Sequence, residues 1–178
     1  MSYIIQTERL GLRNWKLSDL TAMAALNQDP QVMRYFPAMP DAAATQAYIK
    51  KMQAQFAKTQ YCYFAAEILS TQEFIGFIGL MYQDYEAHFT PCVDIGWRLK
   101  QTAWGKGYAT EGAKACLKYA FDTLQLATIY SVAPIVNTPS IGVMKKIGMT
   151  LSTTFKHPKL EDFPTLETCV LYVIHRPK

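Results

Sequence analysis

Hydrophobic residues repeat along this chain with two different periods, which divide it into helical and extended segments. Within residues 41–59, Tyr48, Met52 and Phe56 fall four apart, as on one stripe of an amphipathic helix. A stronger stripe follows Gly107, and it consists of Ala113, Leu117, Ala120, Phe121 and Leu124. We therefore expect two helices whose apolar faces pack on a sheet.

The middle of the chain is apolar, aromatic and β-branched instead, which is typical of strands. Residues 61–69, 73–82 and 92–99 form three such runs, which we expect to pair antiparallel. The same criteria predict an opening strand (3–15), a helix from Ser18, a turn or short helix (29–33), a strand (128–135), a helix from Pro139 to Gly148, and two closing strands (150–158 and 165–176). This order predicts an α+β fold with a mixed sheet.

The length of 178 residues suits one domain with one core, so we expect a single domain over residues 1–178. Hydrophobic residues make up 50% of the chain and charged residues 18%, a globular composition. The net charge of +4 is too small for a dedicated nucleic-acid-binding protein, but it suits an anionic ligand. No apolar run approaches the roughly 18 residues of a membrane span, and no secretion signal opens the chain.

Four cysteines are scattered through the chain without a CxxC pair or histidines at ligand spacing, and these are Cys62, Cys92, Cys116 and Cys169. We expect buried thiols rather than zinc ligands or a redox dithiol, and no metal. Together with the lack of a secretion signal, this pattern favours the reducing cytoplasm.

The stretch "WGKGYATEG" places Gly105, Lys106 and Gly107 directly before the clearest predicted helix. Such a turn exposes backbone N–H groups, and the helix adds its unpaired amides and the positive end of its dipole, so an anion should bind there. A Walker loop is excluded because Gly107 follows the lysine, and a dinucleotide fingerprint is excluded because Thr110 occupies the third glycine position. The alternative is that the glycines only make a tight turn between strand and helix.

A second segment, "NTPSIGVMKKIGM", places Asn137 at a strand end and Ser140 at the start of the next helix. With "TERLGLR", "DPQVMRYFP" and "DIGWRL...WGKGYATEG", it resembles the GNAT superfamily of N-acetyltransferases, and within it the ribosomal-protein alanine acetyltransferase branch (RimJ/RimL-like). The resemblance covers nearly the whole chain. It implies the GNAT fold, with a mostly antiparallel sheet of about seven strands, splayed at its central strands and flanked by helices in three layers.

The resemblance also implies acetyl-coenzyme A as co-substrate and assigns residues to it. The amides from Gly105 to Thr110 would hold the pyrophosphate, residues 97–99 would line the pantetheine path, and Asn137 would hydrogen-bond the pantetheine arm. The full set expected at the cofactor is Trp97, Arg98, Leu99, Trp104, Gly105, Lys106, Gly107, Tyr108, Ala109, Thr110, Asn137 and Ser140. One departure is Thr102, which stands where the superfamily pattern has Gln or Arg.

Acetylation of an amine needs a base, a donor for the oxyanion and in some cases an acid for the leaving sulfur. Asp94 is an acid within an apolar strand, and we expect it to be the base, although a salt bridge or a strand-end hydrogen bond would also explain it. Many superfamily members use a tyrosine as the acid, but Met144 occupies that position. The branch suggests Ser140 instead, whose hydroxyl could equally cap its helix. Glu111 is better explained by its place in the first turn of a helix.

Aromatic residues could wall an acceptor groove, and we expect Tyr35, Phe36, Tyr82 and Tyr85 to contribute to it, although such residues are more often core. The predicted function is transfer of an acetyl group to a primary amine by direct attack in a ternary complex. The acceptor by resemblance is a protein α-amine, with ribosomal proteins first; small amines, amino acids and antibiotics are alternatives. A non-catalytic acyl-coenzyme A sensor and a nucleotide-binding module are rivals, and the chain could be a monomer or a homodimer.

Overall fold

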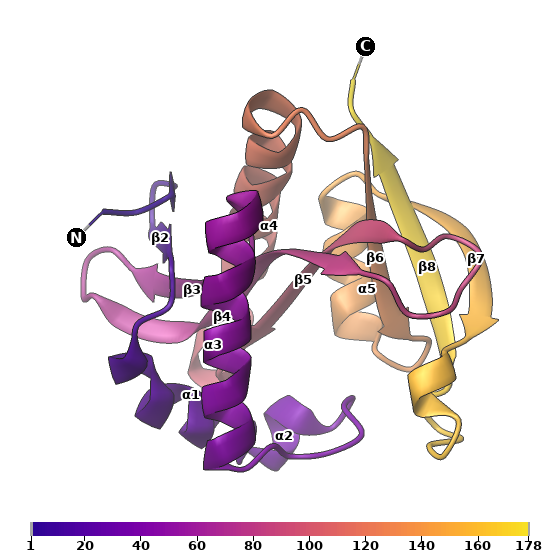
Figure 1. Cartoon of the computed structure of the whole chain (residues 1–178), viewed down its shortest axis with the longest axis horizontal. Coiled ribbons are helices and arrows are strands. Elements are labelled where there is room, and N and C mark those ends of the chain that lie inside the picture. Colours follow the sequence, from indigo (N-terminus) through magenta and orange to yellow (C-terminus); the bar gives the residue numbers. More distant parts are fainter. Residues whose placement is uncertain (1, 178) are drawn as a thin grey trace.

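A single eight-stranded sheet forms the centre of the computed structural model, which describes residues 2–177 (Figure 1). The spatial order is β1-β2-β3-β4-β5-β6-β8-β7. The strands are β1 (Ile5–Gln6), β2 (Leu10–Arg13), β3 (Tyr63–Ile68), β4 (Glu73–Gln83), β5 (Cys92–Leu99), β6 (Thr128–Pro134), β7 (Thr150–Lys156) and β8 (Thr168–His175).

Among the described residues, five α-helices connect and cover the strands, and these are α1 (Leu20–Asn27), α2 (Pro30–Met33), α3 (Ala42–Thr59), α4 (Tyr108–Lys118) and α5 (Thr138–Lys146). The helix α3 begins where the Asp41 carboxylate accepts a hydrogen bond from Ala44 N at 2.7 Å, and it ends at Gln60 in the left-handed conformation. After α4 the chain makes a π-helical turn (Tyr119–Thr123), so the predicted helical segment to Leu124 is not one regular α-helix.

The strand count exceeds the expected number because the opening segment is a hairpin rather than one strand. Ile5 pairs with Leu12, and a tight turn between them is closed by the Thr7 hydroxyl, which accepts a hydrogen bond from Leu10 N at 2.9 Å. The three middle strands β3, β4 and β5 pair antiparallel as predicted. In the part of the chain that the structure describes, β5 and β6 are the only parallel neighbours, which makes the sheet mixed and confirms the predicted α+β class.

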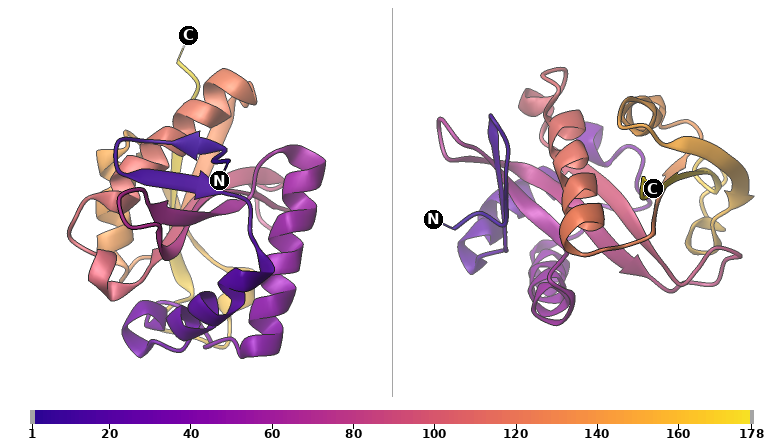
Figure 2. Two further views of the ribbon diagram at one scale, coloured as in Figure 1. Left: turned by 90° about the vertical axis from the view of Figure 1, so that its left-hand side faces the viewer. Right: turned by 90° about the horizontal axis from the view of Figure 1, so that it is seen from above.

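The helices cover the two faces of the first half of the sheet. Figure 2 shows α3 and α4 on opposite sides of the strands. The α4 face is packed so tightly that a β-carbon on Gly112 would lie 2.5 Å from Ile78, whereas Tyr48 on α3 packs against the adjacent Phe77 on the other face. Successive side chains of β4 point to opposite faces of the sheet, so β4 contributes to two separate apolar layers.

A buried ion-pair cluster joins the strands to the first helices. Arg13 on β2 is 4% exposed and donates hydrogen bonds to Glu67 on β3 and to both oxygens of Asp19, the latter at 2.8 Å. Tyr3 adds a hydrogen bond to Glu67 at 3.0 Å. Because Asp19 directly precedes α1, the cluster fixes where α1 leaves the sheet, and α1 leads into α2.

We expect Glu67→Ala to destabilise the protein by about 3–5 kcal/mol, because it leaves the Arg13 guanidinium buried with one carboxylate instead of two. Chemical unfolding measures the change. Asp122→Ala is the matched control, since it breaks the exposed pair between Lys118 and Asp122 and should cost less than about 1 kcal/mol. Similar losses in both variants would contradict a stabilising role for the cluster.

Candidate functional site

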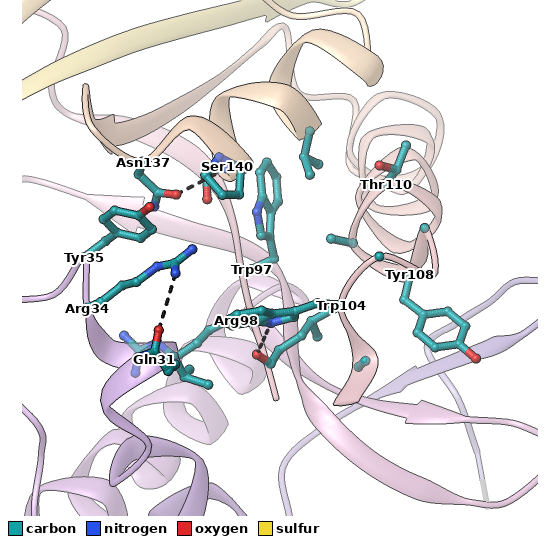
Figure 3. Close-up of a pocket in the computed structure, with 18 of the residues that line it drawn as sticks. Gln31, Arg34, Tyr35, Trp97, Arg98, Trp104, Tyr108, Thr110, Asn137 and Ser140 are labelled. Carbon is teal, nitrogen blue, oxygen red and sulfur yellow. Dashed lines mark hydrogen bonds between the residues drawn. The ribbon is translucent and has the colours of Figure 1, made fainter. Parts of the chain in front are cut away.

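The site begins where the two parallel strands separate. β5 and β6 share a single register pair, Asp94 with Tyr130, and then diverge. Past that pair, the Ser131 hydroxyl donates a hydrogen bond to the Ile95 carbonyl at 2.9 Å. A cavity of about 370 Å³ opens here between the end of β5, the turn before α4, the start of α5, and α2 with its following loop (Figure 3).

The turn before α4 forms one wall of this cavity. Gly105 and Gly107 have φ angles of 71° and 83°, a conformation that favours glycine. The Trp104 indole donates a hydrogen bond to the Leu99 carbonyl at 2.7 Å and thereby closes the turn onto the strand end. The bond from Glu111 N to Gly107 O, at 3.0 Å, opens the hydrogen-bond ladder of α4. The N–H groups of residues 108–110 come before the first hydrogen bond of the helix and therefore have no partner within it. They lie at the cavity wall, where an anion can accept hydrogen bonds from them.

An ion pair holds this turn against the opening hairpin. Glu111 accepts hydrogen bonds from Thr7 at 2.6 Å and from the Arg9 side chain at 2.6 Å, while Arg9 also donates to the Lys106 carbonyl at 3.0 Å. Burial would raise the pKa of Glu111, but the hydrogen bonds from Thr7 and Arg9 outweigh it and keep the pKa below its ordinary value. Glu111 thus has a positioning role beyond its place in the first turn of α4.

The opposite wall is the start of α5. The Asn137 side chain accepts a hydrogen bond from Ser140 N at 3.3 Å and caps the helix, and both residues line the cavity. Figure 3 shows them across the cavity from Thr110. Met144 is 1% exposed and belongs to the core, so its position supplies no proton donor to the cavity.

Asp94 lies on the face of β5 that carries α1 and α3. Its carboxylate accepts hydrogen bonds from the Tyr63 hydroxyl at 2.7 Å and from the Gln83 amide at 3.1 Å. Burial raises its pKa from 3.8 to about 7, although the two hydrogen bonds act in the opposite direction. The carboxyl group is therefore poised to exchange a proton near neutral pH, but Asp94 is not among the residues that line the cavity.

Comparison with known proteins identifies the family. Residues 9–150 match the family described as acetyltransferase (GNAT) domain. The chain belongs to the GNAT acetyltransferases. Two relatives from Bacillus subtilis are the uncharacterized protein YkkB, 32% identical over 84% of this chain and 87% of its own, and the uncharacterized N-acetyltransferase YnaD, 31% identical over 85% of each.

Solved structures agree with this assignment. A GNAT-family acetyltransferase from Bacillus anthracis has a TM-score of 0.79 and 27% identity, covering 96% of this chain and 97% of its own. Two structures that share only the fold were solved with coenzyme A. They are the aminoglycoside acetyltransferase AAC(6')-Ib (TM-score 0.75, 19% identity, 94% and 95% covered) and RimL, a ribosomal alpha-N-protein acetyltransferase (TM-score 0.78, 15% identity, 98% of each covered).

The cavity of this GNAT enzyme gathers most residues that the sequence assigned to the cofactor. Those that line it are Trp97, Arg98, Leu99, Trp104, Gly105, Gly107, Tyr108, Ala109, Thr110, Asn137 and Ser140. Lys106 is exposed and does not line the cavity, although its carbonyl accepts a hydrogen bond from the Arg9 side chain.

The structure brings two of the four expected acceptor residues to the cavity. Tyr35 and Phe36 line the cavity. Tyr82 is 46% exposed outside it, and Tyr85 stacks on His157 with ring centroids 4.5 Å apart. Tyr85 belongs to a separate aromatic cluster because it also meets Phe89 at 6.1 Å.

Sequence reasoning missed several lining residues on α2 and α5, namely Gln31, Val32, Val143 and Lys146. The spacing of Ser140, Val143 and Lys146 places them on one helix face, which was the available indication. Within residues 2–177, no cluster of His, Cys, Asp or Glu could hold a metal ion. None of the helices described is long and apolar enough to cross a membrane.

The raised pKa of Asp94 predicts a pH-dependent stability. Between about pH 4 and pH 7 the folded state holds a proton that the unfolded state releases, so stability falls as pH rises through this window. From about pH 5 to pH 8, wild-type unfolding free energy should drop by about 2–3 kcal/mol more than that of Asp94→Asn. Asp122→Asn, at an exposed carboxylate, is the control and should follow the wild type. Parallel curves for wild type and Asp94→Asn would rule out the raised pKa.

Proposed function

We propose that this GNAT enzyme transfers an acetyl group from acetyl-coenzyme A to a primary amine. The observation that carries the proposal is one continuous cavity, which extends from the free amides at the start of α4 to the space between the end of β5 and the start of α5. Coenzyme A combines an anionic pyrophosphate with a narrow amide-containing arm, and these two parts suit the two parts of the cavity. The coenzyme A complexes of two proteins with this fold support the assignment.

In this proposal, the amides from Gly105 to Thr110 hold the pyrophosphate, with Lys106 adding a positive charge outside the cavity. Trp97, Arg98 and Leu99 line the path of the pantetheine arm, and Asn137 hydrogen-bonds it. When bound, acetyl-coenzyme A supplies a thioester whose carbonyl carbon an amine can attack. The Trp104 indole bond to Leu99 and the Arg9 bond to Lys106 hold the turn in place before the ligand arrives.

The proton transfers are assigned to two residues. Asp94 accepts, through water, the proton that the amine gives up as its nitrogen bonds to the acetyl carbon. Ser140 donates a proton to the sulfur as the carbon–sulfur bond breaks. The cavity-lining residues include no cysteine, so direct transfer with both substrates bound is favoured over an acyl-cysteine intermediate.

The acceptor we propose first is the N-terminal α-amine of a protein, with ribosomal proteins as candidates, because the motifs resemble that branch. An amino acid, another small amine or an antibiotic is the alternative, since the aminoglycoside enzyme has the same fold. The buried Met144 in the usual acid position favours a second candidate function, a sensor that binds acyl-coenzyme A without turnover. Four free, buried cysteines suit a cytoplasmic location.

Thiol release from acetyl-coenzyme A tests the function directly. The acceptor panel should contain N-terminal peptides, amino acids, polyamines and an aminoglycoside, and calorimetry on the same sample should measure cofactor binding. The proposal requires binding together with amine-dependent thiol release. Binding without release for any acceptor would identify the sensor, and absence of binding would reject both functions.

Gly107→Val should weaken acetyl-coenzyme A binding at least about tenfold, because a branched side chain at φ 83° strains the turn and covers its amides. Calorimetric titration measures the loss, and thermal unfolding shows whether the variant is folded. Gly142→Val is the matched control on α5, where a β-carbon meets no atom within 4 Å. If a folded Gly107→Val bound as tightly as this control, the amides would not be the pyrophosphate site.

Asp94→Asn should leave acetyl-coenzyme A binding within about twofold and lower kcat by on the order of 100-fold, the usual contribution of a general base. The wild-type kcat/KM should fall below an apparent pKa of about 7, because the protonated carboxyl cannot accept the amine proton. Steady-state rates across pH for both proteins check this. An unchanged acidic limb in Asp94→Asn would assign the base to another group.

A further inference from the structure

Arg98 is a cation without a carboxylate partner. Its Nη1 donates a hydrogen bond to the Asn27 side-chain oxygen at 2.8 Å, while its Nε is fully buried and has no hydrogen-bond partner. Within the described residues 2–177, no Asp or Glu lies within ion-pair distance of Arg98, in contrast to the doubly paired Arg13. Burial lowers the pKa of the Arg98 guanidinium. Arg98 as a whole is half-buried, but its Nε is shielded from solvent. Charges that lose their water in this way are normally paired in proteins, so Arg98 calls for a counter-ion.

The surroundings of Arg98 fix the orientation of its guanidinium. The Cζ atom lies 3.8 Å from the ring centroid of Phe36 and 5.4 Å from that of Phe77. Asn27, its hydrogen-bond acceptor, is itself held by the Thr45 hydroxyl at 3.0 Å. A planar guanidinium group held in this way can bind a carboxylate with little loss of side-chain conformational freedom.

Arg98 lines the cavity at the end away from α4. In Figure 3 its side chain extends from β5 toward Gln31 and away from Tyr108 and Thr110, which mark the proposed pyrophosphate site. The Tyr48 hydroxyl is also buried without a partner, and its ring packs 5.8 Å from Phe77, the ring that also contacts Arg98. Two unsatisfied polar groups, the Tyr48 hydroxyl and Arg98 Nε, therefore adjoin the same ring.

The charge of the cavity wall has one sign. Three cations, Arg34, Arg98 and Lys146, line it, and no Asp or Glu does. Lys146 lies on α5. In Figure 3 the Arg34 and Arg98 side chains both lie near Gln31 of α2 and away from Tyr108 and Thr110, and Arg34 also packs over Trp104 at 5.6 Å. A polycationic acceptor would meet uncompensated repulsion at this wall.

We propose that Arg98 binds a carboxylate of the acceptor, so that the enzyme selects amines that also carry a carboxylate and rejects polyamines and aminoglycosides. The inference rests on the proposed acetyl transfer and names its acceptor class. The carboxylate belongs either to the amino acid that bears the reacting amine or to an acidic side chain near a peptide N-terminus. Arg98 is then a specificity residue, whereas Asp94 handles the proton.

Matched acceptor pairs test this selection with the wild-type enzyme. One pair is an amino acid and its amide, and the other is a peptide with Glu as its second residue and the same peptide with Gln. We expect kcat/KM to be at least about tenfold higher for the carboxylate member of one pair, which also tells the two carboxylate sources apart. Equal rates within both pairs, or a preference for a polyamine, would overturn the inference.

Three variants show whether Arg98 is responsible. Arg98→Gln should abolish the preference: KM for the carboxylate acceptor should rise at least about tenfold more than KM for its amide, whereas weaker cofactor binding would affect both acceptors equally. Arg98→Lys retains the positive charge but not the planar group that can donate two parallel hydrogen bonds, so it should keep part of the preference. Lys145→Gln removes an exposed charge beside Lys146 on α5 that does not line the cavity, and it should behave as wild type. A loss of kcat shared by all acceptors in Arg98→Gln would instead place Arg98 at the transferring acetyl group and overturn the inference.

Binding without turnover separates this inference from the proposed function. Calorimetric titration of the four acceptors into the wild type and the Arg98 variants, with coenzyme A present, measures recognition even if no thiol is released. Carboxylate-dependent binding that requires Arg98 would support the inference in a protein that does not turn over. Thiol release together with equal binding of carboxylate and amide would overturn the inference and leave the transferase intact. Should Arg98→Gln not fold, the wild-type pairs and Arg98→Lys decide.

Discussion

The parallel pairing of β5 with β6 lasts for one residue pair, and the site depends on that short contact. Asp94 and Tyr130 hold the strands together at one point, and beyond it the edge of β5 has no neighbouring strand. Backbone groups at such an edge need partners, and Ser131 satisfies only the Ile95 carbonyl. In the proposed function, the amide groups of the pantetheine arm supply hydrogen-bond partners for other backbone groups at this edge.

The faces of the sheet divide the remaining tasks. On one face, α4 directs its free amides toward the cavity, and the Arg9–Glu111 pair holds the turn that precedes it. On the other face, α1 and α2 bring Asn27 and Phe36 to Arg98, and the buried Arg13 cluster fixes where α1 begins. In the proposed function, anion binding and acceptor recognition use different elements, so the acceptor could change while the residues proposed for the cofactor stay the same.

Sequence patterns predicted the elements with long, regular periods and the turn whose glycines require left-handed backbone angles. They missed the hairpin at Thr7, because its polar turn interrupts one apolar segment without a glycine or proline. Tyr85 was expected in the acceptor groove, but it packs on His157, and this contact joins two loops that are far apart in the sequence. Arg98 was expected to line the cofactor path. That it has no carboxylate partner could not be predicted, because its hydrogen-bond partner, Asn27, lies 71 positions away in the sequence. Periodicity describes local structure, and these contacts are not local.

A crystal structure of the protein with coenzyme A is the most direct test of whether the gap between β5 and β6 is the cofactor slot. We predict the pyrophosphate within hydrogen-bond distance of amides between Gly105 and Thr110, and the pantetheine arm beside Trp97 with Asn137 as a partner. The thiol should end between the Ser140 side of the cavity and Arg98. Coenzyme A bound elsewhere on the surface, or bound with the gap left open, would contradict the account.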